Sequence, residues 1–169
     1  MKRNGFILCA LLVFARPPGA PAQDVGLELN SVPAPIALET LDGKPVNLAA
    51  YMGRKPVIIE FWATWCPVCK ALEPEMNGVY KKYGKQVEFL TVAVGVSQTP
   101  RSVKRHLTDH TLPGQILWDG DGKAVRAFMA PGTSYIVVLD AKGRVAYTGF
   151  GADQKLDAVL AKVVPPARK

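Results

Sequence analysis

Cys66 and Cys69 are separated by two residues, and this pair is the part of the chain best suited to do chemistry. Two thiols at this spacing can form a disulfide, open it, and pass it to another protein through a mixed disulfide. The preceding residues 57–63 are apolar and rich in β-branched and aromatic side chains, which is typical of a buried strand. The residues after the pair repeat apolar side chains near a 3.6-residue period, which predicts an amphipathic helix.

The pair is therefore expected where a central strand leads into the N-terminus of a helix over residues 66–83. Unpaired N–H groups and the positive end of the helix dipole stabilise a thiolate at such a place. They lower the pKa of a cysteine from about 8.5 to roughly 3.5–7.5. Cys66, nearer the exposed end, is the predicted nucleophile, and Cys69, one turn further in, is the predicted resolving thiol.

Other interpretations of the two cysteines remain open. A purely structural disulfide would close a two-residue loop, which constrains the unfolded chain little. A zinc site normally needs four ligands, and the sequence has no second Cys-x-x-Cys motif. Two buried, inert thiols are a further interpretation. The alternative function is a Cu(I)-binding or delivery module that uses Cys66 and Cys69, because Cu(I) is a soft ion that thiolates suit.

Alternating apolar segments and turn signals predict the elements that hold this pair. Strands are expected over residues 36–41, 45–48, 57–63, 87–94, 115–118, 135–139 and 145–148, and helices over 66–83, 100 to about 110, and 156–163, with short helical turns at 49–52 and 125–128. Thr99 is the predicted N-cap of the second helix, with Pro100 in its first position. His106 and His110 on that helix are interpreted as structural or surface residues. Strands that alternate with helices and end in a hairpin favour a mixed sheet with helices on both faces.

Residues 61–69 read Phe-Trp-Ala-Thr-Trp-Cys-Pro-Val-Cys, and this stretch resembles the thioredoxin superfamily, in particular its TlpA/ResA/DsbE-like branch of secreted thiol–disulfide oxidoreductases. The resemblance covers about residues 32–164. It implies a thioredoxin-like α/β fold, in which helices flank a mixed central β-sheet and an N-terminal β-hairpin is added. It also implies reduction of disulfides in selected proteins, often during cytochrome c or copper-centre assembly, with electrons from a membrane partner. No cofactor besides the redox-active Cys66–Cys69 disulfide, and no metal, is expected.

Glu60 lies six residues before Cys66, where thioredoxins place a buried acid beneath the dithiol. A carboxyl group on so apolar a strand should be desolvated, and its pKa should rise toward neutrality. Such a group suits proton exchange with Cys69, so Glu60 is a predicted catalytic residue. The alternative is that Glu60 points out of the sheet and is merely solvated, because alternation along the strand does not decide its face.

The wall of the site in this family is usually a loop that ends in a cis-proline, and the chain departs from that pattern. Counting back from Asp140 and Gly143, the proline should fall at Ser134, and the nearest proline is Pro131. We expect Ser134 to replace it, with a trans Thr133–Ser134 peptide, because a cis bond before a non-proline residue costs about 3–4 kcal/mol. Ser134 would then bring an N–H and a hydroxyl near the sulfurs. The predicted substrate-binding residues are Trp65, Pro67, Thr133 and Ser134.

The first 22 residues predict a secretory signal peptide. Lys2 and Arg3 supply the positive start, residues 6–15 are an apolar run of ten, and Ala20-Pro21-Ala22 is a small-residue cleavage site. Ten apolar residues are fewer than the roughly 20 that a membrane-spanning helix needs. The expected location is the periplasm, and an uncleaved anchor that faces the periplasm is the alternative.

Cleavage would leave residues 23–169, which predict a single thioredoxin-like domain because no repeat or linker interrupts them. It would also remove Cys9, so that no other cysteine competes for the disulfide. Three of the 21 basic residues and none of the 14 acidic ones would be lost, which lowers the net charge from +7 to about +4. The basic residues are not interleaved with aromatic ones, so nucleic acid is not an expected partner. The expected partners are client proteins with disulfides or thiols and a membrane electron-transfer protein, and the chain is expected to be a monomer.

Overall fold

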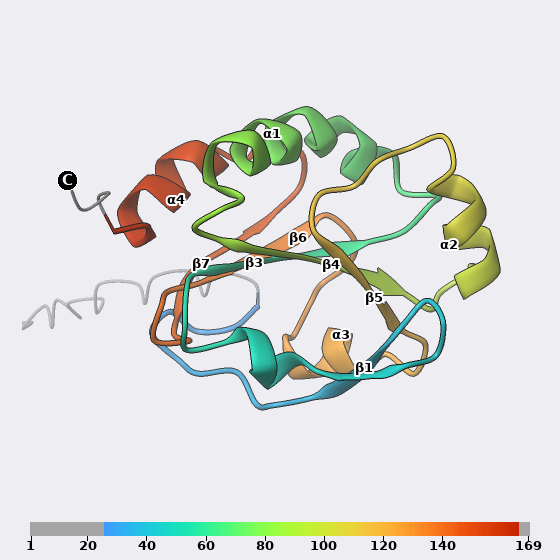
Figure 1. The fold of residues 1–169 in the computed structure, drawn as a ribbon, viewed down its shortest axis with the longest axis horizontal. Coiled ribbons are helices and arrows are strands. Elements are labelled where there is room, and N and C mark those ends of the chain that lie inside the picture. The colour runs from blue at the N-terminus through green and yellow to red at the C-terminus, as the bar shows by residue number, and fades with distance from the viewer. Residues whose placement is uncertain (1–25, 166–169) are drawn as a thin grey trace, which may run out of the picture.

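The computed structural model describes residues 26–165, and the predicted signal peptide lies outside this range. A single mixed sheet has seven strands in the order β2-β1-β5-β4-β3-β6-β7. The strands are β1 (Ala37–Thr40), β2 (Pro45–Asn47), β3 (Val57–Trp62), β4 (Glu88–Val94), β5 (Gln115–Asp119), β6 (Tyr135–Leu139) and β7 (Val145–Phe150). The helices are the 3₁₀ helix η1 (Leu48–Tyr51) and α1 (Pro67–Tyr83), α2 (Pro100–His106), α3 (Lys123–Ala127) and α4 (Leu156–Val163). Figure 1 shows α1 and α4 along one side of the sheet and α3 on the other, so the predicted mixed sheet with helices on both faces is confirmed.

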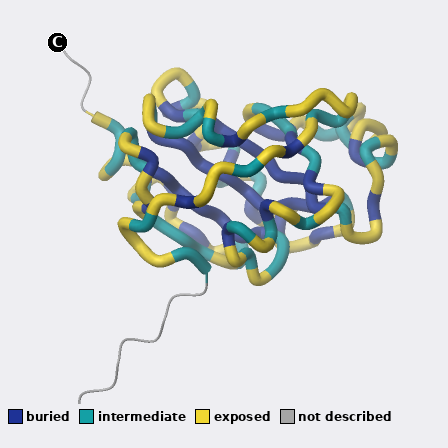
Figure 2. The backbone as a smooth tube through the Cα atoms, turned by 90° about the horizontal axis from the view of Figure 1, so that it is seen from below, coloured by how far each residue is buried: buried dark blue, intermediate teal, exposed yellow. Residues whose placement is uncertain are grey.

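Strand β3 is the centre of the sheet, and all of its residues are buried. It pairs in parallel with β4 and antiparallel with β6, so both of its edges are covered. A strand that is also covered on both faces reads as a continuous apolar run, which is the pattern of residues 57–63. Figure 2 shows the buried segments crossing the middle of the molecule, with the exposed segments in the loops around them.

The side chains of β3 divide between two apolar clusters, one on each face. Ile58 packs with residues of α1 and α4, whereas Ile59 and Phe61 belong to the cluster on the opposite face. Because successive side chains of a strand point to opposite faces, Glu60 shares the face of Ile58 and lies under α1. The two clusters therefore decide on which face of β3 Glu60 lies, a point that the sequence left open.

Helices α1 and α2 connect parallel neighbours, from β3 to β4 and from β4 to β5. Both connections step in the same direction across the sheet, and crossovers of this type are almost always right-handed. Two right-handed crossovers in one direction place their helices on the same face. The start of α1 therefore lies at the carboxyl end of β3 with α2 beside it, which Figure 1 shows. This is the edge of an α/β sheet at which functional sites form.

The predicted N-terminal hairpin is confirmed as β1 and β2, which pair antiparallel. Its turn passes through Gly43 at a φ of 76°, a left-handed conformation that glycine adopts without strain. Strand β1 then pairs antiparallel with β5, so the hairpin adds two strands to the edge of the sheet beyond β5.

Helix α2 differs from its prediction because it ends at His106 and not near His110. Its start is as predicted, with Thr99 as N-cap and Pro100 in the first turn. At its end, the hydroxyl of Thr108 donates to the carbonyl of Arg105 at 2.8 Å. Hydroxyl groups that bond nearby carbonyls compete with the helix, and the chain tightens into a turn. Across residues 26–165, no helix is both long enough and apolar enough to cross a membrane.

Candidate active site

Cys66 and Cys69 form a disulfide at the N-terminus of α1, with their Cα atoms 5.3 Å apart. Cys66 is the N-cap, and its Sγ accepts a hydrogen bond from the N–H of Cys69 at 3.0 Å. Pro67 occupies the first helical position, where its missing N–H costs nothing. Cys66 retains 6% of its exposure and Cys69 none. The two sulfurs are therefore unequal: the backbone N–H stabilises charge on Cys66, and an incoming sulfur can reach only that side.

The loop before the cysteines is held by Gln98, a residue that the sequence analysis missed. Its side-chain carbonyl accepts from the N–H of Thr64 at 2.9 Å, and its amide donates to the carbonyl of Val94 at 2.6 Å. The indole N–H of Trp65 donates to the carbonyl of Val96 at 2.8 Å. Trp65 stays 48% exposed beside Cys66, so its ring offers a fixed apolar surface. A lone glutamine in a loop carries no local signal for this role.

Glu60 is 2% exposed, so the interpretation of Glu60 as a solvated surface residue is wrong. Burial and, to a smaller extent, the nearby negative charge of Glu73 on α1 together raise the pKa of this carboxyl to about 8. Loss of hydration disfavours the charged form, because the apolar face under α1 offers little to replace water. A carboxyl that titrates near neutral pH can both take up and release a proton.

Ser134 lies immediately before β6, and among residues 26–165 no peptide bond is cis, so the bond before Ser134 is trans as expected. Its N–H donates to the carbonyl of Phe61 at 2.7 Å, and its carbonyl accepts from Gln154 at 3.1 Å. The N–H that was expected near the sulfurs therefore bonds to β3 and extends the pairing of β6 with that strand. The Oγ of Ser134 is buried and has no hydrogen-bond partner in the described part of the chain.

Replacing Ser134 by proline and by glycine should have opposite effects on the stability of the fold. Ser134 has a φ of 65°, which proline cannot adopt and glycine adopts freely. We expect Ser134→Pro to destabilise the fold by about 3 kcal/mol, because it also removes the hydrogen bond to Phe61. Ser134→Gly removes an unpaired buried hydroxyl and a strained backbone, and we expect it to stabilise by about 1 kcal/mol. Urea unfolding of both variants measures the difference, and a proline variant as stable as the glycine variant would contradict the assignment.

A cavity of about 190 Å³ adjoins Cys66 and brings together residues from β3, α1 and the end of α2. Its lining includes the two predicted contact residues Trp65 and Pro67, while Thr133 and Ser134 are not part of it. The lining also includes four side chains with ionisable groups, and none of them was a predicted site residue: Lys70, Glu73, His106 and His110. The sequence signal that could have identified the two histidines was their spacing of four residues, which is typical of one helix face. No local pattern shows that this face lies near the dithiol.

In the described part of the chain, the fold does not supply a third metal ligand to Cys66 and Cys69. Within residues 26–165, no three side chains of His, Cys, Asp or Glu are grouped so as to hold a metal ion. The Cu(I) alternative therefore rests on the two sulfurs of Cys66 and Cys69 alone.

Sequence comparison finds clear relatives for this chain. The family model described as Redoxin matches residues 17–163. The thiol-disulfide oxidoreductase ResA of Bacillus thuringiensis subsp. konkukian (strain 97-27) is 26% identical over 161 residues, which cover 94% of this chain and 92% of that protein. The thioredoxin-like protein YneN of Bacillus subtilis (strain 168) is 29% identical over 143 residues, covering 80% of this chain and 82% of its own length.

Solved structures share the same architecture. A protein of Chlorobium tepidum, provisionally described as the thiol:disulfide interchange protein DsbE, superposes with a TM-score of 0.73 at 22% identity, covering 82% of this chain and 99% of that one. The exposed lipoprotein thioredoxin Etrx1 of Streptococcus pneumoniae strain TIGR4 superposes with a TM-score of 0.64 at 27% identity, covering 77% and 98%. The thioredoxin-like fold predicted from the sequence is thereby confirmed.

Proposed function

Because this chain belongs to the Redoxin family and is a thiol–disulfide oxidoreductase of the TlpA/ResA/DsbE-like branch, we propose that it reduces disulfides of selected client proteins in the periplasm. The observation that carries this proposal is the asymmetry of the dithiol at the start of α1. The Sγ of Cys66 accepts a backbone N–H and is partly accessible, whereas Cys69 is fully buried. Such an arrangement supports attack by the first sulfur and resolution by the second.

The reaction begins with the reduced protein. The thiolate of Cys66 attacks one sulfur of a client disulfide, whose S–S bond breaks, and the other client sulfur leaves as a thiolate that takes up a proton. Cys69 then loses its proton and attacks Cys66, which breaks the mixed disulfide and releases the second client sulfur. The client gains two electrons and two protons, and the chain is left with its Cys66–Cys69 disulfide.

Glu60 is the group we assign to the proton of Cys69. Its carboxyl is buried on the face of β3 that α1 covers, and with a pKa near 8 it is mostly protonated at neutral pH. The smaller ionised fraction can accept the proton of Cys69, and the protonated form can give it up again. Trp65 and Pro67, both exposed beside Cys66, are assigned to contact with the client. Thr133 is assigned to the same role, on the side of the site formed by the segment before β6. Ser134, which is fully buried, is assigned to holding that segment against β3.

The setting of the reaction follows from the sequence and the resemblance. We assign residues 1–22 to a signal peptide and 23–169 to one domain, a monomer that acts without a cofactor other than its own disulfide. A membrane electron-transfer protein would restore the dithiol after each turnover, and proteins of cytochrome c or copper-centre assembly are the proposed clients. An uncleaved N-terminus would leave the same domain tethered to the membrane and facing the periplasm.

The direction of electron flow is tested by equilibrating the purified protein in glutathione redox buffers and measuring the fraction of free thiol. For a reductant we expect a potential well below that of the strong oxidant DsbA, about −120 mV. The reduced protein should also reduce insulin disulfides and be left with one disulfide per chain. A potential near or above about −120 mV would reverse the proposed direction and leave an oxidant in its place.

A further inference from the structure

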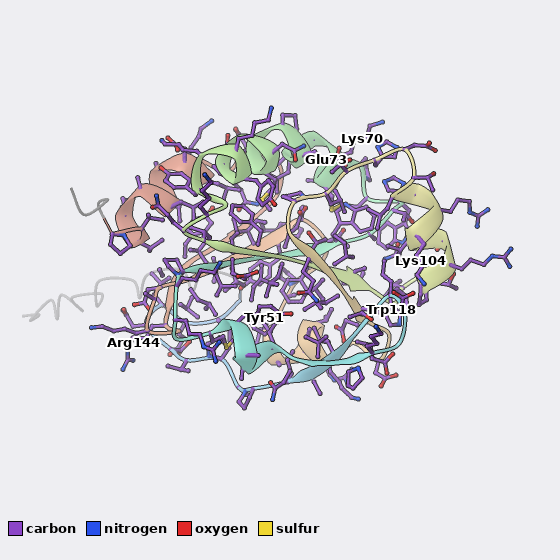
Figure 3. The ribbon with its side chains drawn as sticks, in the orientation of Figure 1. Tyr51, Lys70, Glu73, Lys104, Trp118 and Arg144 are labelled. Atoms are coloured by element: carbon purple, nitrogen blue, oxygen red, sulfur yellow. A yellow bond between two sulfur atoms is a disulfide. The ribbon has the colours of Figure 1, made fainter. Side chains whose placement is uncertain are left out.

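The cavity beside Cys66 has room for a chemical group from a bound partner. Its volume of about 190 Å³ is several times the roughly 30 Å³ share of one water molecule. Trp65, Pro67 and Lys70 in its lining are exposed, so the cavity can be reached from solvent. Figure 3 shows Lys70 and Glu73 on the part of α1 nearest α2, which supplies the opposite wall. An occupant of this cavity would lie directly beside the attacking cysteine.

Two imidazole rings form the wall on the side of α2. His106 and His110 stack with ring centroids 4.1 Å apart and planes 8° from parallel, and His106 also packs against Trp62 at 5.3 Å. The Nε2 of His106 is buried and makes no hydrogen bond to any residue between 26 and 165. A buried nitrogen without a partner costs about 1–3 kcal/mol. A hydrogen bond to an oxygen of an occupant would remove that cost, and it requires the ring to shift because the nitrogen has almost no exposed surface.

Around the two histidines, three basic side chains (Lys70, Arg101 and Arg105) stand against two acidic ones (Glu73 and Asp109). From α1, the ammonium of Lys70 and the carboxylate of Glu73 face His106 with opposite charges, and Asp109 is the acidic group beside it on its own segment. Burial lowers the pKa of His106, and the neighbouring His110 lowers it further. This lowered pKa favours the neutral form of His106, so the positive charge in the lining is that of Lys70. The exposed residues Arg101 and Arg105 give the rest of α2 the same sign.

We propose that this cavity binds the carboxylate of an Asp or Glu side chain of the client protein that lies within a few residues of the attacked cysteine. The carboxylate accepts hydrogen bonds from the imidazoles and the ammonium of Lys70, while Trp62 and Trp65 contact its methylene groups. The inference rests on the proposed function, because it concerns the substrate of the same dithiol. It makes the cavity a specificity site, which selects clients by an acidic residue next to their disulfide.

The test uses synthetic peptides with one cysteine joined to thionitrobenzoate in a mixed disulfide. The reduced protein attacks the peptide sulfur through Cys66, and the S–S bond breaks to release the coloured thionitrobenzoate anion. Peptides carry Asp, Asn or Lys at each of the three positions on either side of the cysteine. At one or two of these positions we expect the Asp peptide to react about tenfold faster than its Asn counterpart near pH 6, which corresponds to about 1.4 kcal/mol. The preference should shrink in about 0.5 M salt, because salt screens the attraction between the carboxylate and the ammonium of Lys70.

Three variants test which residues cause the preference for the Asp peptide. We expect His106→Gln and His110→Gln to lose it, while Lys85→Gln, which removes an exposed cation beyond the far end of α1, keeps it. Because His106 packs against Trp62, circular dichroism checks its folding, and His110→Gln gives an independent answer. Equal rates for Asp and Asn peptides at every position, or a preference that survives in both histidine variants, would overturn the inference. Failure of the Asn peptides to react at all would instead overturn the proposed function.

Discussion

Replacing Cys66 by serine is expected to lower the rate of disulfide reduction by at least about 10³-fold, because a hydroxyl is not ionised at neutral pH and cannot attack a disulfide. Cys69→Ser should behave differently. Its Cys66 can still attack, but nothing resolves the product, so a mixed disulfide with the client accumulates. Insulin reduction gives the rate, and non-reducing electrophoresis with mass spectrometry gives the trapped species.

The two variants control for each other, since each removes one sulfur from the same turn of α1. Serine is a good N-cap residue, so Cys66→Ser should still accept the N–H of Cys69 and keep the helix start intact. Its unfolding midpoint should therefore remain close to that of the reduced parent. Trapped clients joined to Cys69 in the Cys66→Ser variant, at the yield seen for Cys69→Ser, would show that the roles of the two sulfurs are reversed.

Glu60→Gln is expected to slow the resolving step by about 10²-fold at neutral pH, because general acid–base groups contribute at least this factor and an amide cannot take up the proton of Cys69. The first attack by Cys66 should change much less, so the variant should accumulate mixed disulfide during turnover. Stopped-flow measurement of both phases separates the two effects. Glu39→Gln, on the exposed side of β1, is the matched control and should leave both phases unchanged.

The same substitution should alter how stability depends on pH. Glu60 is buried with a pKa near 8 in the fold, above the ordinary value of 4.5 for a glutamate side chain. Between these pH values the folded chain keeps a proton that the unfolded chain releases, so rising pH destabilises the fold. The stabilising contribution is complete below about pH 4.5 and is lost by about pH 8, and it amounts to a few kcal/mol.

Glu60→Gln cannot titrate, so its stability should be flatter across this range, and near pH 8 it should exceed that of the parent by about 2 kcal/mol. Urea unfolding of the oxidised proteins at several pH values measures this difference. A parent whose stability rises between about pH 5 and pH 8 would contradict the raised pKa. The comparison also tests whether the buried acid is kept at a cost in stability, as expected of a group retained for proton transfer.

Local interactions explain why the position of the dithiol between a strand and a helix could be predicted from the sequence. A β-branched apolar run, a proline in the first helical turn and an apolar repeat near 3.6 residues depend on neighbours within a few positions. They correctly placed β3, the start of α1 and the N-terminal position of Cys66. The end of α2 was missed by the same logic, because a side chain–backbone bond from Thr108 competes with helix continuation.

The sequence by itself determined the chemistry of this protein: a Cys-x-x-Cys pair between a buried strand and a helix, within a thioredoxin-like sheet. Only the tertiary structure decided what surrounds that pair. Packing on the two faces of β3 put Glu60 under α1, and pairing of β6 with β3 engaged the N–H of Ser134 in a hydrogen bond to Phe61. Two crossovers on one face brought His106 to the cavity beside Cys66, forty positions earlier in the chain. These contacts form between elements that are far apart in the sequence. They depend on tertiary packing, which local sequence patterns do not specify.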